Sequence, residues 1–168
     1  MEWPLHTAAY QVRPGCRAVL HAHSMTLVAF SLAKVGKGGS DLRLPDTRVL
    51  LGAYQACGKV AFAPYSLPGS LALAEGCRQA FETGADCVIL QNHGVVVVGE
   101  TMHQAYDRFV SLEYLARSIV NSLPLGVPIR PLSPTILKYA MDVDNESPDN
   151  PFPRQLPRAK VMPRIVTG

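Results

Sequence analysis

Three histidines are placed so that they could hold one metal ion. His21 and His23 form a His-x-His pair inside residues 17–23, a segment with the length and composition of a strand. Because alternate residues of a strand point to the same side, the two imidazoles leave the backbone in one direction. His93 lies in a short turn between two β-branched runs. Three neutral imidazoles with an open fourth position are a common ligand set of catalytic zinc. The sequence therefore predicts a divalent metal, zinc in preference to others, at His21, His23 and His93.

Such a site points to carbonyl or enolate chemistry. A Lewis-acidic metal would polarise a ketose carbonyl and stabilise the enediolate left after a carbon–carbon bond breaks, while a carboxylate close by moves the proton. The other candidate residues are weaker. His6 is expected to pack or face solvent, His103 to be exposed, and Tyr65 to pack within its turn. Glu113 and Arg117 are expected to form an i,i+4 pair on a solvated helix face.

Hydrophobic periodicity and capping signals predict the elements that carry these residues. Ser24 and Ser70 are the expected N-caps of two helices, and a capping-box pattern starts at Thr101. The expected elements are helices over 5–11, 25–33, 48–55, 71–82, 102–120 and 133–141, and strands over 17–23, 60–63, 87–90 and 95–98. The glycine-rich residues 35–40 are expected to form a loop.

The strands at 87–90 and 95–98 are joined by four residues, a spacing that predicts an antiparallel hairpin in which Gly94 takes an unusual backbone angle. Other strands connect through helices. We therefore expect an α/β fold, a three-layer sandwich with a mostly antiparallel central sheet. We expect one domain over residues 1–123, followed by a proline-rich C-terminal tail over 124–168 that is disordered or laid over a neighbouring subunit.

Composition narrows the class of protein. Of the 168 residues, 48% are hydrophobic and only 17% are charged, which excludes a disordered chain and indicates that other subunits cover some apolar surface. The net charge of +3 comes without a basic stripe, so nucleic-acid binding is not expected. No apolar run reaches the roughly 20 residues needed to cross a bilayer, and no secretory signal is recognised. The four cysteines have no CxxC spacing, so we expect a cytoplasmic protein without a disulfide framework.

Several separated motifs occur in order along the chain. They are Glu2–Tyr10, Arg13-Pro14, Ala18–Ser24, Ala63–Tyr65, Pro68–Ser70 and Asn92–Gly99. Together they resemble the class II aldolase/adducin family, from residue 2 to about residue 121. The resemblance implies that the His-x-His pair and His93 bind zinc. It also implies that the glutamate 19 positions before His21, which is Glu2, is the acid/base, and that the protein is a homotetramer with sites at subunit interfaces.

The chain departs from the family pattern in two places. Family members carry a segment before the glutamate that supplies sheet strands and most of the phosphate-binding loops, whereas this chain begins one residue before Glu2. We therefore expect an N-terminally truncated or degenerate member. The position of the family's catalytic tyrosine falls near Leu50, and Tyr54 is only a loose substitute.

Three functions are compatible with these residues. The first is a zinc-dependent aldolase-type lyase that acts on a small sugar phosphate or related hydroxy-carbonyl compound through a metal-stabilised enediolate, with dehydration and decarboxylation left open. The second is a sugar-phosphate 4-epimerase of the same family, whose members carry aspartate in place of Glu2. The third is a non-catalytic module like the adducin head, which keeps the fold without the metal. The presence of all three histidines argues against the third.

Overall fold

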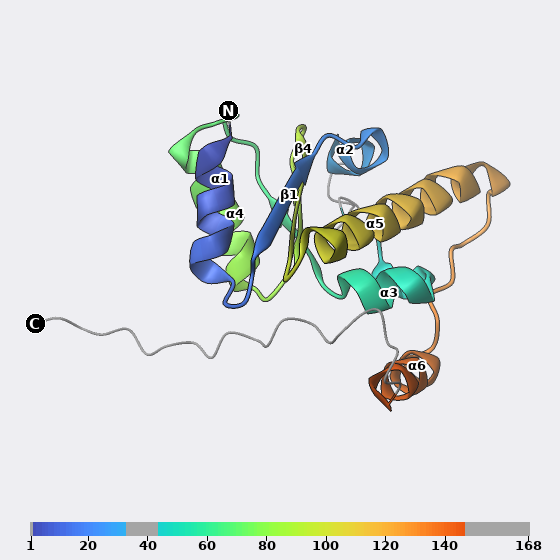
Figure 1. The fold of residues 1–168 in the computed structure, drawn as a ribbon. Coiled ribbons are helices and arrows are strands. Elements are labelled where there is room, and N and C mark those ends of the chain that lie inside the picture. The colour runs from blue at the N-terminus through green and yellow to red at the C-terminus, as the bar shows by residue number, and fades with distance from the viewer. Residues whose placement is uncertain (1, 33–43, 147–168) are drawn as a thin grey trace, which may run out of the picture.

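A four-stranded sheet lies between two layers of helices (Figure 1). The computed structural model describes residues 2–32 and 44–146, so the loop expected over 35–40 lies outside the described residues. The strands are β1 (Ala18–Ala22), β2 (Val60–Ala63), β3 (Cys87–Leu90) and β4 (Gly94–Gly99). The helices are α1 (Trp3–Val12), α2 (Met25–Leu32), α3 (Leu51–Cys57), α4 (Leu71–Glu82), α5 (Met102–Ser122) and α6 (Pro134–Glu146), with 3-10 turns η1 (Thr47–Val49) and η2 (Leu123–Leu125).

The strand order in the sheet is β1-β4-β3-β2. β3 and β4 form the expected antiparallel hairpin, and β4 also pairs antiparallel with β1. β2 and β3 are parallel, because α4 carries the chain back along the sheet between them. The α/β class is confirmed, but the sheet is mixed, and our expectation of a mostly antiparallel sheet is wrong. Periodicity locates a strand and does not fix the direction of its partner when a helix joins the two.

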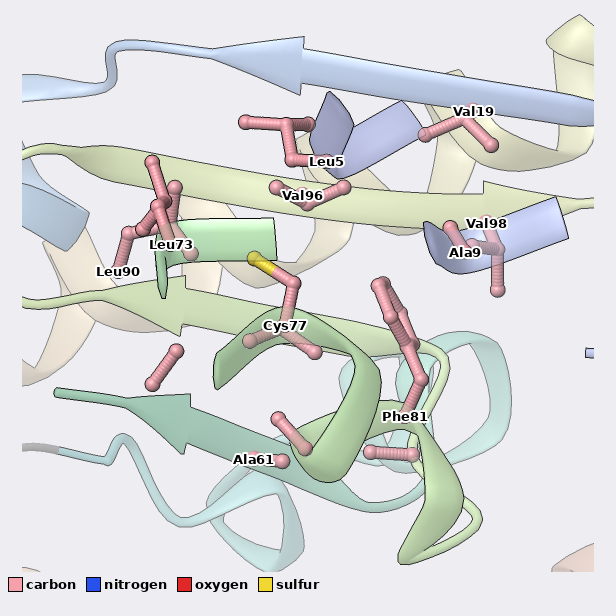
Figure 2. Close-up of a cluster of buried hydrophobic side chains, with 14 residues drawn as sticks. Leu5, Ala9, Val19, Ala61, Leu73, Cys77, Phe81, Leu90, Val96 and Val98 are labelled. Carbon is pink, nitrogen blue, oxygen red and sulfur yellow. The ribbon is translucent and has the colours of Figure 1, made fainter. Parts of the chain in front are cut away.

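One face of the sheet packs under α1 and α4. Val96 and Val98 of β4 belong to a buried cluster with Leu5 of α1 and Phe81 of α4 (Figure 2). Figure 2 shows the side chains of both helices pointing at the same strands. Burial of α1 against this face fixes where the helix begins, and therefore where the residue before it lies.

The opposite face packs under α2, α3 and α5. Val95 and Val97 of β4 belong to this second cluster, together with Leu27 of α2, Ala53 of α3 and Leu112 of α5. β3 and β4 are consequently buried at every position. Strands covered on both faces have no solvent-facing side, which explains the unbroken β-branched run in β4.

The predicted helix caps are present. Ser24, Ser70 and Thr101 each accept a hydrogen bond from the backbone N–H three residues later. The side chain of Gln104 reaches back to the N–H of Glu100, at 2.8 Å, rather than to that of Thr101. These local signals explain why α4 has the predicted bounds and α5 begins where expected.

A buried ionic triad ties α1, β3 and α5 together. Asp86, the residue before β3, contacts Arg13 after the end of α1 and Arg108 of α5, whose Nη2 lies 3.1 Å from Asp86 Oδ2. Their side chains are 3–4% exposed. Arg108 also donates to the carbonyl oxygens of Ala56, at 3.0 Å, and Val98, at 2.6 Å. Buried charges are costly unless they are paired and hydrogen-bonded, and these contacts pair all three charged groups, although Arg13 Nε has no hydrogen-bond partner among the described residues.

The last described helix, α6, lies against α3. Leu137 is its buried anchor, and the N–H of Leu132 donates to the Arg48 carbonyl at 2.9 Å. Within residues 2–32 and 44–146, no helix is both long and apolar enough to cross a membrane. The division into a domain over 1–123 and a tail over 124–168 stays a prediction.

Replacing Asp86 by alanine should destabilise the fold strongly. The substitution leaves two guanidinium groups buried without their shared carboxylate, and breaking a buried ion pair in this way costs about 3–5 kcal/mol. Urea unfolding followed by circular dichroism measures the loss. Glu82→Ala is the matched control, because its partner Arg78 lies on the surface of α4 and its effect should be far smaller. An Asp86→Ala chain as stable as the wild type would contradict the role of the triad.

Candidate metal centre

The strand register aims His21 at the face of the sheet that carries α1. His21 is opposite Val96 in the β1–β4 ladder and lies two residues after Val19, which belongs to the cluster under α1. Its Nδ1 is 3.0 Å from the carbonyl oxygen of Val95. A carbonyl oxygen can only accept, so Nδ1 donates to it, and in the neutral ring Nε2 keeps the lone pair that a metal needs. The backbone thus orients His21 to bind a cation through Nε2.

His23 and His93 lie just outside the ladder. His23 follows the last residue of β1, and His93 immediately precedes β4 in the turn from β3. Gly94 allows the two segments to approach. A Cβ at Gly94 would lie 2.6 Å from the Ala22 carbonyl oxygen, 3.0 Å from His23 Cδ2 and 3.2 Å from His21 Cε1. No side chain fits in this space without moving backbone.

The unusual backbone angle of the turn is at Asn92. Its φ is 54°, which places it in the left-handed region. Our expectation that Gly94 takes that angle is therefore wrong, and the glycine is needed for close approach instead. Asparagine tolerates the left-handed conformation better than most residues, because its short amide can hydrogen-bond locally.

α1 brings Glu2 to the histidines. Glu2 is the N-cap residue of the helix, whose Leu5 is buried against the sheet. One of its carboxylate oxygens, Oε2, contacts His21 Nε2, and the other, Oε1, lies 3.2 Å from His93 Nε2. The second contact lacks hydrogen-bond geometry, so Oε1 is a buried oxygen without a hydrogen-bond partner among the described residues.

The ligand atoms of Glu2, His21, His23 and His93 all lie within 4.8 Å of one another. His21 Nε2 and His23 Nε2 are 3.1 Å apart. Two nitrogens bound tetrahedrally to one zinc at about 2.0–2.1 Å would be roughly 3.3–3.4 Å apart, so the spacing suits a shared ion. A cation would also supply the partner that Glu2 Oε1 lacks. The donor set, its spacing and the orphaned oxygen together fit a divalent metal.

The electrostatics of the cluster favour the uncharged histidine. Burial lowers the pKa of His21, because its charged form loses hydration; the hydrogen bond to Val95 and the charge of Glu2 act in the opposite direction. Burial likewise lowers the pKa of His6, one turn along α1, and the neighbouring charge of His21 adds to the effect. Neutral imidazole is the form that binds metals, so this environment prepares His21 as a ligand.

The family model of the class II aldolase and adducin N-terminal domain matches residues 1–120. The chain belongs to this family. Its α/β fold is similar to that of solved class II aldolases. An L-fuculose 1-phosphate aldolase structure superposes with a TM-score of 0.69 at 24% identity, over 86% of this chain and 63% of that chain.

Two kinds of curated family members are similar in sequence. An L-fuculose phosphate aldolase of Methanococcus maripaludis is 34% identical over 124 residues, which are 73% of this chain and 62% of that protein. A 3-oxo-tetronate 4-phosphate decarboxylase of Escherichia coli is 34% identical over 116 residues, 68% of this chain and 51% of that protein. The crystal structure of YgbL from Escherichia coli is 27% identical, with a TM-score of 0.68 over 82% of this chain and 63% of that chain. The chain thus spans about half to three-fifths of the length of the curated relatives it matches.

The class II aldolase fold does not bring every predicted residue to the cluster. Tyr54 lines a separate cavity with Arg48, Lys59 and neighbouring residues, none of which belongs to the cluster. Tyr65 is 55% exposed, so our expectation that it packs within its turn is wrong. The backbone N–H of Tyr65 donates to the side chain of Gln91, at 3.0 Å, which ties its loop to the residues before the turn.

Sequence reasoning also missed a residue behind the site. Glu113 does pair with Arg117, at 3.2 Å, but its side chain is only 18% exposed, so the prediction of a solvated face is wrong. Its carboxylate accepts hydrogen bonds from Ser24 and Thr26, which directly follow the His-x-His motif. The sequence did carry one signal for this contact, because the two hydroxyl residues stand close to His21 and His23 and need hydrogen-bond partners.

Replacing Gly94 by alanine should dismantle the cluster while sparing much of the fold. The new Cβ would force β4 away from the Ala22 carbonyl and displace both histidines of the His-x-His pair. We expect a zinc affinity at least roughly tenfold lower, measured by competition with a chelator. Gly52→Ala in α3 is the control, since nothing lies within 4 Å of its Cβ position and affinity should not change. Equal affinities in the two variants would refute the close-approach role of Gly94.

Proposed function

We propose that this chain carries the metal site of a zinc-dependent aldolase-type lyase, with His21, His23 and His93 as ligands and Glu2 as the acid/base. Its substrate would be a small sugar phosphate or related hydroxy-carbonyl compound. The observation that carries this proposal is the convergence of one carboxylate and three imidazoles within 4.8 Å, from three separate parts of the chain.

The roles of the side chains follow from their contacts. A bound divalent cation would act as a Lewis acid on the substrate carbonyl oxygen. His21 is oriented by the Val95 carbonyl, and His93 is held by the turn between β3 and β4. Glu2 lies beside both rings through a carboxylate with one unpartnered oxygen. The Glu2 carboxylate can take a proton from the substrate and return it, which is the work of a general acid/base.

Decarboxylation is the second candidate reaction. The similarity to 3-oxo-tetronate 4-phosphate decarboxylases matches that to fuculose phosphate aldolases in percentage identity. Both reactions leave negative charge on the carbon next to a carbonyl, so one metal and one carboxylate serve either. A 4-epimerase would use the same cation for retro-aldol cleavage and re-addition. A non-catalytic module is disfavoured, because a chain without chemistry has no need to gather these four side chains.

We also propose that the chain works in the cytoplasm as a homo-oligomer, a tetramer by family resemblance. Three exposed side chains on α5, Tyr106, Val110 and Tyr114, follow one another at intervals of four and make an apolar stripe on the helix surface. Exposed apolar surface of this kind is often covered at a contact between subunits. All four cysteines are free thiols, which suits a reducing compartment.

The purified chain should bind about one zinc ion per subunit. Elemental analysis after mild dialysis measures the content, and a chelator competition measures the affinity. His21→Ala should lower the affinity steeply, because the two remaining imidazoles make a poor site. His103→Ala is the matched control, as this histidine is exposed on α5, beside Asp107, and lies outside the cluster. A folded wild-type chain with no affinity for added zinc would refute the metal site.

Glu2→Gln should lower turnover while leaving zinc content intact. Loss of a positioned acid/base costs roughly 100-fold or more. Cleavage of fuculose 1-phosphate and decarboxylation of 3-oxo-tetronate 4-phosphate by the zinc-loaded chain separate the two candidate reactions. Glu82→Gln, an exposed carboxylate of α4, should behave as wild type. An unimpaired Glu2→Gln chain would remove Glu2 from the mechanism.

A further inference from the structure

The sheet holds only one of the three histidines directly. His21 is paired with Val96 within the β1–β4 ladder. His23 lies beyond Ala22, the last paired residue of β1, and His93 lies in the turn that precedes β4. Within its turn, His93 donates its N–H to the Leu90 carbonyl at 3.2 Å. The strand ladders themselves include neither His23 nor His93, although both side chains belong to the cluster.

The end of α2 holds the turn that carries His93. The backbone N–H of Asn92 donates to Ser31 Oγ at 2.9 Å, across 61 positions of sequence. Ser31 is 1% exposed, and its hydroxyl donates to the Val28 carbonyl at 2.6 Å. Because that bond uses the hydroxyl proton, an oxygen lone pair is left to face Asn92. The hydrogen bond falls on the one described residue other than glycine with a positive φ, at 54°, directly before His93.

The start of α2 holds the residue after His23. Ser24 is 8% exposed, and its hydroxyl accepts from the N–H of Leu27, at 3.1 Å, while donating to Glu113 of α5. Thr26 donates to the other Glu113 oxygen at 2.8 Å. A serine can cap a helix without donating to a carboxylate, so the contact with Glu113 has an effect beyond the helix cap. It fixes the direction of the Ser24 hydroxyl and fastens the start of α2 to α5.

α2 thus connects the segments that carry the two histidines outside the strand ladders. It begins one residue after Ser24 and ends one residue after Ser31. Its Leu27 is fully buried in the cluster with α5, so the helix is held against the fold between its two polar contacts. A rigid helix with a hydrogen bond at each end is a suitable spacer between a strand end and a turn.

We propose that Ser31 and Glu113 are positioning residues of the three-histidine site. Ser31 acts on His93 through the backbone of Asn92, and Glu113 acts on His23 through the hydroxyl of Ser24. The proposal rests on the metal site proposed above. Residues that orient metal ligands typically change metal affinity by roughly 10- to 100-fold when they are replaced.

The test compares Ser31→Ala and Glu113→Gln with two matched controls. Ser122→Ala removes a hydroxyl that also donates to a carbonyl three residues earlier, at 2.7 Å, on α5. Glu82→Gln removes a surface carboxylate of α4. Each chain of 168 residues is prepared without metal. Its zinc affinity is measured by chelator competition, its visible absorption is recorded after loading with Co²⁺, and its stability is measured by urea unfolding.

The cobalt spectrum separates positioning from a merely structural role. It reports ligand geometry in the folded chain, which a loss of stability alone leaves unchanged. We expect Ser31→Ala and Glu113→Gln to bind zinc roughly 10- to 100-fold more weakly and to shift the cobalt absorption, with both controls at the wild-type values. If one variant fails to fold, the other still decides the question for its own end of α2.

Imidazole nitrogen NMR of the zinc-loaded chains identifies the affected ligand. Ser31→Ala should move the signals of His93 most, and Glu113→Gln those of His23, while His21 changes least because the ladder holds it. Folded variants with wild-type affinity and wild-type cobalt spectra would overturn the positioning role and leave the metal site standing. A wild-type chain that binds neither zinc nor cobalt would overturn both proposals.

Discussion

The antiparallel pairing of β1 with β4 is the contact on which the site depends. It sets His21 opposite Val96, so the ring points toward α1, and it places the Val95 carbonyl where it accepts from His21 Nδ1. The same ladder ends beside Gly94, where the lack of a side chain lets the His93 turn approach the His-x-His segment. One strand pair therefore decides which nitrogen of His21 is free and how close the other rings come.

Packing on the α1 side supplies the carboxylate. Glu2 stands at the start of a helix whose apolar residues are buried on the sheet, and Arg13, just past the other end of the helix, is bound by Asp86. Asp86 in turn contacts Arg108 on the opposite helical layer. Replacing such a group of buried charges by apolar residues is often neutral or stabilising in other proteins. We interpret the triad here as a contact that fixes α1, and hence Glu2, in one position.

Local features of this chain could be predicted from the sequence, and long-range features could not. α4, β2 and β3 have the predicted bounds, since caps such as Ser70 and β-branched runs are signals carried by neighbouring residues. The histidines were found because strand periodicity and turn chemistry are local as well. Glu2 was identified only through the family resemblance, because a single glutamate forms no pattern. The direction of β2 relative to β3, the triad around Asp86 and the contact of Glu113 with Ser24 join residues far apart in sequence, so no spacing rule could reveal them.

The distance along the chain between β1 and β4 also orders events during folding. His21 and Val95 are 74 positions apart, and closing a loop of that length costs about 4 kcal/mol in chain entropy before any contact repays it. The innermost pair of the β3–β4 hairpin, Leu90 with Gly94, closes over only three intervening residues, so the hairpin can form long before β1 joins. His21 and His23 are synthesised first, but they can join His93 only after β4 has left the ribosome. A cation that needs all three imidazoles therefore meets them only on an assembled sheet. The ion of a zinc finger drives folding, whereas the cation proposed here would bind only after the sheet has formed.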